Sequence, residues 1–219
     1  MNWQDASGKY FNTIHANNFE FYTELNTVIQ REPSSLWPAE TLGQMSSIGL
    51  KKGSPFRPSV AHKHVLTSAV ATGNAIARSL SFRPRNADCW MYGEESAWFT
   101  AFVGGDYRWL VDGGAGGKNM DARAFFFYIA TLNTPAMVLE MVGVGSQYAL
   151  VALDSNKNYL DGGKPYTLNV PKDIPAADFW SVVVYDPQTR SQLQTDQQFP
   201  SVNSKRKLSD GITPAMTAN

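Results

Sequence analysis

The chain has 219 residues, of which 43% are hydrophobic and 17% charged, a composition typical of a folded protein rather than a disordered one. Its net charge is zero and its pI about 6.8, which argues against a constitutive nucleic-acid-binding protein, because such proteins usually carry a basic excess. A single cysteine, Cys89, excludes an intrachain disulfide, and no apolar run in the sequence approaches the roughly 18 residues of a membrane span.

The N-terminal residues lack the charged and apolar regions of a signal peptide, so none is predicted. Residues 12–32 are expected to be helical, because apolar side chains recur every three or four positions until Pro33. A second helix is expected to begin after Ser34 or Ser35 and to end near Gly49, followed by an ordered loop over 51–58.

The clearest predicted helix covers residues 59–80. One stripe of it is mostly apolar and rich in small residues, which predicts close packing against another element. The members of that stripe are Val65, Ala69, Thr72, Ala75, Ile76 and Leu80. Arg78, Arg83 and Arg85 cluster near its C-terminal end, where cations suit the helix dipole; an anion site is the alternative.

Residues 86–117 are unusually aromatic and are interrupted by glycines, above all in the run 113–117. Aromatic faces stack on sugar rings, so this segment is the best candidate wall of a binding site, although large aromatics are more often core residues. The candidate binding residues are Trp90, Tyr92, Trp98, Tyr107 and Trp109. Cys89 lies beside Trp90 without a neighbouring cation in sequence and is expected to be a buried, inert thiol.

A further helix is predicted over residues 119–140, with Asp121 near its positive end and Pro135 ending or kinking it. Residues 143–199 then alternate short apolar runs with turn signals, which predicts an antiparallel meander with strands at 148–153, 166–170 and 179–185. Helices precede strands, so the predicted fold class is α+β.

Sequence motifs for known chemistry mostly fail in this chain. Gly143 and Gly145 resemble a dinucleotide-binding fingerprint, but a helix precedes them, a strand follows and the third glycine is missing. Residues 154–165 imitate a calcium loop, but Tyr159 stands where glycine is needed and Pro165 where glutamate is needed, so a hairpin turn is favoured. Nothing in the sequence shows whether His15, His62 and His64 converge, and no metal site and no cofactor is predicted.

Acidic side chains near the aromatic segment are weak candidates for a general acid and base of the kind that glycosidases use. They are Glu94, Glu95, Asp106, Asp112 and Asp121. Arg123, Asp178, Asp186 and Arg190 are expected to form structural ion pairs beside the meander.

Several phrases of the sequence carry a family resemblance: residues 12–18, 48–53, 121–128, 134–137, 145–148 and, most specifically, 179–191. Together they resemble the paired families DUF1254 and DUF1214, which are mostly bacterial. The resemblance implies a jelly-roll-like β domain preceded by helices, and it brings no established reaction or catalytic residue. Relatives extend further at both ends, so the chain resembles an internal fragment whose strand edges would be unpaired.

The resemblance suggests a helical and aromatic region over residues 1–118, an incomplete DUF1214-like region over 119–208 and a disordered tail over 209–219. Two functions stay open. One is a binding or assembly module, with homo-oligomers formed through exposed strand edges. The other is part of an enzyme that acts on a sugar or another polar small molecule, using carboxylates beside the aromatic segment. Nucleic acid is not expected as a partner, and no membrane span is expected.

Overall fold

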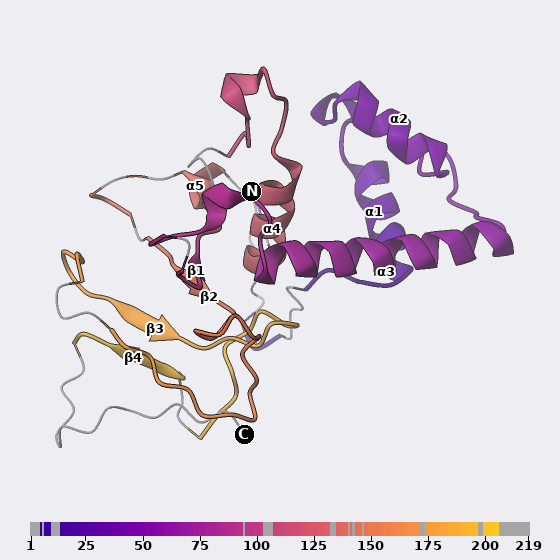
Figure 1. The fold of residues 1–219 in the computed structure, drawn as a ribbon. Coiled ribbons are helices and arrows are strands. Elements are labelled where there is room, and N and C mark those ends of the chain that lie inside the picture. The colour runs from indigo at the N-terminus through magenta and orange to yellow at the C-terminus, as the bar shows by residue number, and fades with distance from the viewer. Residues whose placement is uncertain are drawn as a thin grey trace. The chain divides into compact units, whose positions relative to one another are not determined.

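The computed structural model describes residues 5, 7–9, 14–93, 95–102, 107–131, 135–139, 141, 143–145, 147–170, 174–196 and 199–205. Helices occupy the N-terminal half and short antiparallel strand pairs follow (Figure 1), which confirms the predicted α+β class. The chain divides into two compact units, residues 1–83 with 123–132 and residues 84–122 with 133–219.

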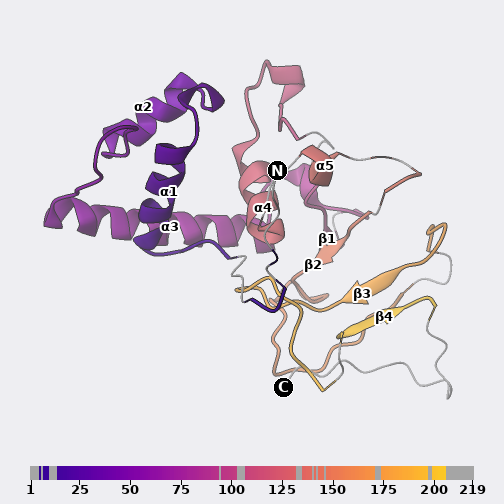
Figure 2. The same cartoon turned by 180° about the vertical axis from the view of Figure 1, so that it is seen from behind.

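The first unit contains α1 (Glu20–Arg31), α2 (Ala39–Ser47) and α3 (Val60–Phe82), with a short 3-10 helix at Ser34–Leu36. Both α1 and α2 lie on the same side of α3 (Figures 1 and 2). Their core is built on Tyr22, Ile29, Leu50 and Leu66, which are nearly inaccessible to solvent. The predicted helices of this region are therefore confirmed, with α1 beginning later than expected.

Side-chain hydrogen bonds support the start of α3 and the end of α1. The Ser59 hydroxyl accepts a hydrogen bond from the His62 backbone at 3.2 Å and so caps the first turn of α3. Lys52 donates to the carbonyls of Gln30 and Glu32, both at 2.8 Å, where the last carbonyls of α1 lack helical partners. The loop over residues 51–58 is thereby tied to α1.

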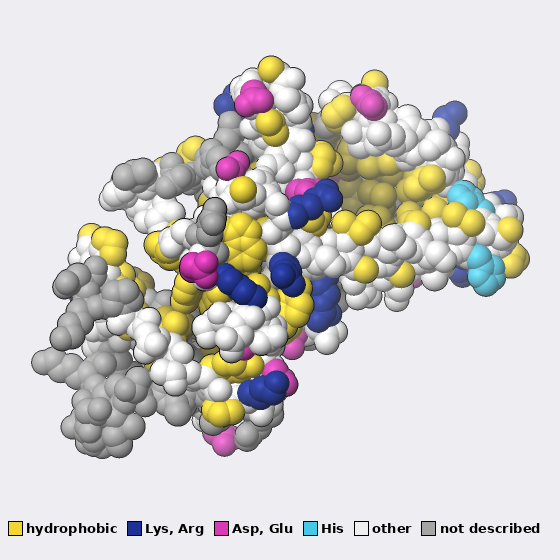
Figure 3. Space-filling view, in the orientation of Figure 1, with side chains coloured by type: hydrophobic (Ala, Val, Ile, Leu, Met, Phe, Trp, Pro, Cys, Tyr) yellow, Lys and Arg dark blue, Asp and Glu magenta, His cyan; other side chains and the backbone are white. Residues whose placement is uncertain are grey.

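The predicted apolar stripe of α3 is largely exposed, so the expectation that it packs against another element is wrong for Val65 and Ile76, whereas Leu80 is half-buried. Val65 is 64% exposed and Ile76 54% exposed, whereas Leu66 on the neighbouring face is 3% exposed. Figure 3 shows apolar side chains gathered in a hollow between α2 and α3. Small side chains such as Ala69 fit an exposed helix as well as a buried one, because alanine favours helix in both settings.

The predicted helix over residues 119–140 is two helices, α4 (Met120–Ala130) and α5 (Pro135–Val138). Thr131, directly after α4, has a φ of 59°, a left-handed conformation that ends the helix before Pro135 is reached. Phe125, Phe126 and Tyr128 are buried as expected. Phe127 is 40% exposed. Among the described residues, no helix combines the length and apolar character needed to cross a membrane.

The strands are short and form two separate pairs. Strand β1 (Trp98–Phe99) pairs antiparallel with β2 (Leu150–Val151), and β3 (Ser181–Val183) pairs antiparallel with β4 (Ser201–Asn203). Strands were predicted at 148–153 and 179–185, and each segment contains one. The predicted strand at 166–170 is wrong, because those residues form no strand. The meander is also wrong in part, because β2 pairs with the aromatic segment rather than with a meander neighbour.

Candidate functional site

The aromatic segment folds into a hairpin that adds to the β1–β2 pair. Met91 donates to the carbonyl of Trp98 at 3.0 Å, and Thr100 donates to the carbonyl of Cys89 at 2.8 Å. These bonds place Trp90 opposite Phe99, in a bridge that extends the strand. Because side chains alternate along a strand, Trp90 and Phe99 share one face, and Trp98 lies on the other.

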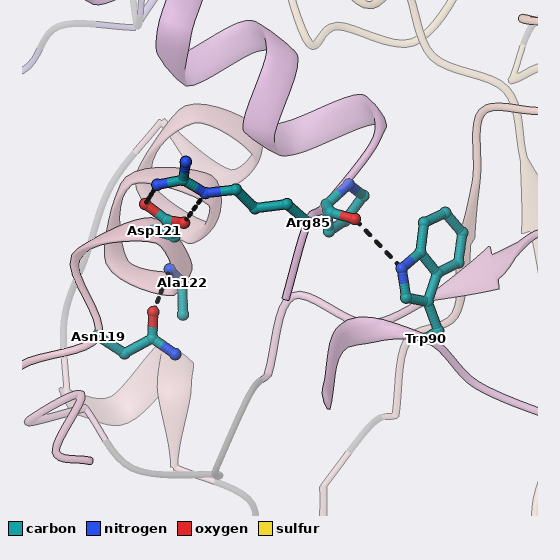
Figure 4. Close-up of polar contacts among 6 residues, drawn as sticks. Arg85, Trp90, Asn119, Asp121 and Ala122 are labelled. Carbon is teal, nitrogen blue, oxygen red and sulfur yellow. Dashed lines mark hydrogen bonds and ion pairs between the residues drawn. The ribbon is translucent and has the colours of Figure 1, made fainter. Parts of the chain in front are cut away.

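Trp90 is held in a structural role. Its ring meets that of Phe99 edge-on, with centroids 5.8 Å apart, and its indole N–H donates to the carbonyl of Pro84 at 3.2 Å (Figure 4). The ammonium of Lys157 lies 6.0 Å from the ring centroid and donates to the carbonyls of Glu95 and Ser96. Trp90 is half-buried, and an indole whose N–H is satisfied and whose ring is packed is typical of a structural residue.

The five aromatic candidates do not form one wall. Trp109 is 3% exposed and belongs to the core, whereas Tyr92 and Tyr107 are exposed. Trp90 and Trp98 lie on opposite faces of the hairpin, as its register requires. These five side chains therefore do not share one face, and their role in binding stays a prediction.

The glycine run closes a second, tight hairpin. Val111 donates to the carbonyl of Gly117, and Gly116 donates to the carbonyl of Val111, both at 3.0 Å. A Cβ on Gly116 would lie 2.7 Å from Val111 Cγ1, closer than side chains tolerate. The run is thus required by the turn itself, which explains its glycines without a ligand.

The candidate carboxylates belong to different local structures. Glu94 and Asp106 lie outside the described residues. Glu95 is exposed in the hairpin turn, and Asp112 is exposed at the start of the glycine turn. In the described part of the chain, no hydrogen bond joins any two of Glu95, Asp112 and Asp121.

Asp121 forms an ion pair with Arg85. The guanidinium meets both carboxylate oxygens, with Nε 2.5 Å from Oδ2 and Nη2 3.0 Å from Oδ1 (Figure 4). The hydrogen bonds to Asp121 and its charge raise the pKa of Arg85. Both oxygens of the Asp121 carboxylate are therefore engaged in an ion pair within the chain.

The same pair fixes the start of α4. Asp121 lies in the first turn, where the helix dipole favours a negative charge, and the Asn119 side chain accepts a hydrogen bond from the Ala122 backbone at 3.0 Å. The sequence predicts chiefly a dipole effect for the arginine cluster, with an anion site as the alternative. The anion that Arg85 meets is a carboxylate of this chain. Sequence reasoning missed Asn119, although its place before an acidic first turn is a capping signal.

Cys89 is confirmed as a buried thiol, 1% exposed. Burial, followed by the charges of Asp88 and Asp121, raises its pKa to about 11. The thiolate that a nucleophile or metal ligand needs is therefore scarce at neutral pH. No group of three His, Cys, Asp or Glu side chains that could hold a metal gathers within the described ranges.

Turns shape the C-terminal half. Asp154 Oδ1 accepts hydrogen bonds from the backbones of Asn156 and Asn158, both at 2.9 Å, and these bonds lower the pKa of Asp154. Leu153 and Tyr159 then pair across the turn, so the hairpin predicted in place of a calcium loop is confirmed. Asp186 Oδ1 closes the next turn by accepting from the backbones of Gln188 and Thr189.

Comparison with known proteins bears on the C-terminal part. No curated protein matches the chain. The predicted pairing with DUF1254 stays a prediction, as does the jelly-roll arrangement. Residues 145–215, which contain β2, β3 and β4, match the family model described as Protein of unknown function (DUF1214).

Proposed function

We propose that this protein is a binding module without catalytic activity, and that it takes up an extended polypeptide segment as an added strand beside β3. The DUF1214 match assigns no reaction. The observation that supports the proposal is the outer edge of β3, where backbone groups of a strand face away from its partner. Strand addition uses such groups for affinity and neighbouring side chains for specificity.

The edge follows from the register of the β3–β4 pair. Val184 donates to the carbonyl of Pro200 at 3.3 Å, and Ser204 donates to the carbonyl of Trp180 at 3.0 Å. Even-numbered residues of this strand therefore turn their backbone groups toward β4, and Ser181 and Val183 turn theirs away. Among the described residues, no hydrogen bond reaches the backbone groups of Ser181 or Val183 from that outer side.

The side chains beside the edge are apolar and accessible. Phe179 is 59% exposed and Tyr185 53% exposed, and both share a strand face with Val183, because side chains alternate along a strand. Two exposed aromatics at the ends of an unpaired edge give a docked strand an apolar surface as well as hydrogen bonds. This combination favours a polypeptide ligand over a compact polar molecule.

The test uses labelled, extended nine-residue peptides with alternating apolar and polar residues. Binding is measured by fluorescence anisotropy to the wild-type chain, Val183→Pro and Val183→Thr. Proline removes the outward N–H of residue 183 without removing a bond to β4, and threonine keeps that N–H in a side chain of similar shape. We expect Val183→Pro to lose at least about tenfold in affinity and Val183→Thr to bind like the wild type. Equal binding by the proline variant, at unchanged far-ultraviolet circular dichroism, would refute edge docking.

A second candidate is a carbohydrate-active role, and it rests on Tyr92, which is 75% exposed, in the same hairpin turn as the exposed Glu95. The same protein is heated with a panel of sugars, because a ligand that binds the folded state raises the melting temperature. If a sugar raises it, and Tyr92→Ala removes the increase, this second role replaces the first.

A further inference from the structure

The strand β3 and its flanks have an aromatic residue at each end and a valine at the centre. In residues 179–185, Val182 is the midpoint, Ser181 and Val183 flank it, and Phe179 and Tyr185 stand at equal distances from it. When such a segment meets itself antiparallel about Val182, Phe179 faces Tyr185 and Ser181 faces Val183. A twofold contact needs this kind of self-complementary surface.

We propose that the strand taken up beside β3 is β3 of a second copy, so that two chains form one continuous sheet in the order β4–β3–β3–β4. This inference rests on the proposed edge docking and names its partner. β3 and β4 lie side by side in both ribbon views (Figures 1 and 2), and the outer side of β3 is the one that would receive the second copy.

The hydrogen bonding fits this register. Ser181 and Val183 both turn their backbone groups outward, and the twofold register makes each the partner of the other in the second chain. Directly opposed residues that exchange both N–H···O=C bonds are the hydrogen-bonded pairs of an antiparallel ladder. Val182 meets its own copy in a non-hydrogen-bonded pair, where Cα atoms are about 4.5 Å apart.

The side chains fit it as well. Phe179 of one chain faces Tyr185 of the other at both ends of the contact, and such aromatic cross-strand pairs stabilise a sheet. No residue from 179 to 185 is charged, so the central contact involves no like-charge repulsion and buries no ion.

Charge limits the contact at its ends. The register places Asp178 opposite Asp186 of the second chain, and like charges directly opposite are unfavourable. A contact of a single strand pair is also small beside the roughly 1,200–2,000 Å² of stable interfaces. The dimer is therefore a weak, concentration-dependent one that strengthens with salt.

The experiment combines association and cross-linking in the full chain. Sedimentation velocity over a roughly hundredfold range of concentration should show a monomer–dimer equilibrium. Asp178→Lys turns two like-charge pairs into two opposite-charge pairs and should tighten the dimer by roughly three- to tenfold at low salt. Val182→Cys should form an intermolecular disulfide, because opposed Cα atoms lie within the range of about 4.4–6.8 Å that a disulfide bridges.

Val184→Cys is the matched control, because Val184 is a half-buried valine on the same face of the strand and faces Trp180 in the twofold register. The wild-type chain controls for Cys89, which is buried. A monomer at every concentration, equal cross-linking of the two cysteine variants, or a weaker dimer with Asp178→Lys would each overturn the inference. If the chain stays monomeric while peptides still bind the wild type and not Val183→Pro, the second copy is wrong and edge docking stands. If peptides also fail to bind, both are wrong.

Discussion

Replacing Gly116 by alanine tests whether the glycine run of the second unit is a close-packed turn or an open loop suited to a ligand. The new Cβ would lie 2.7 Å from Val111 Cγ1 and 2.9 Å from Val111 Cβ. The backbone cannot retreat freely, because the Gly116 N–H already donates to the carbonyl of Val111 at 3.0 Å. Either the side chain of Val111 or the turn must move.

Overpacking of this kind costs about 1–3 kcal/mol of unfolding free energy. For a chain of this length each kcal/mol lowers the melting temperature by about 2–4 °C, so a decrease of about 2–12 °C is expected. The assay is urea denaturation, followed by tryptophan fluorescence, together with a thermal melt. The added substitution Val111→Ala should restore only part of the loss, because the Cβ of residue 111 stays at 2.9 Å.

Gly43 supplies the control. It lies in the interior of α2 with nothing within 4 Å of an added Cβ, so Gly43→Ala should raise the stability by up to about 1 kcal/mol. A Gly116→Ala variant as stable as the wild type, beside a stabilised Gly43→Ala variant, would show that the turn is not packed against Val111. The glycines would then need another explanation, and a loop that adapts to a ligand would return as the first one.

Three further predictions concern the core, the buried thiol and a turn. Ile29→Ala should cost about 2–5 kcal/mol and Ile29→Val about 0.5–1.5 in urea denaturation, because Ile29 is 2% exposed; equal losses would contradict the packing. Burial raises the pKa of Cys89 from 9.0 to about 11, so unfolding releases a proton between these values. Stability should be intact below pH 9 and fall by about 1.4 kcal/mol per pH unit toward pH 11, and Cys89→Ala should lack that part of the slope. Asp154→Ala should lower the melting temperature more than Asp154→Asn, because the amide oxygen can still accept from Asn156 and Asn158.

Local signals were sufficient for the helices and turns. Pro33 and the cap at Ser59 mark where α1 and α3 end or begin, and both can be read from residues adjacent in sequence. The turns at Asp154 and Asp186 follow from the same logic, since each aspartate bonds backbone groups only two to four residues further on. Where one residue supplies the whole physical cause, the sequence predicts the outcome.

Pairing over long distances could not be read in this way. β1 and β2 are about fifty positions apart, and nothing in the apolar run at 148–153 indicates that its partner lies in the aromatic segment. The stripe of α3 shows the same limit. Periodicity identifies an apolar face, but which face is buried depends on where Tyr22 and Leu50 approach the helix.

The arrangement of the candidate binding residues depends on strand pairing, and their role in binding stays a prediction. Trp90 and Trp98 are eight positions apart, and the hairpin register, which sequence does not give, places them on opposite faces. Asp121 is a candidate acid by sequence, and in the structure Arg85 contacts both of its carboxylate oxygens. The sequence predicts unpaired strand edges without indicating which strand carries them. Which residues of β3 face outward required the bonds of Val184 and Ser204.

The two aspartates that flank β3 suggest how such an edge remains soluble. Charged residues beside an unavoidable apolar strand act against uncontrolled edge-to-edge growth. Asp186 is committed to its turn, because its carboxylate accepts from Gln188 and Thr189, so changing it would disturb the local fold. Asp178 is exposed and lies outside any helix or strand, so its charge can be changed with little effect on the monomer. If the twofold contact is correct, the affinity of the dimer is therefore set chiefly at Asp178, and the register at Ser181 and Val183.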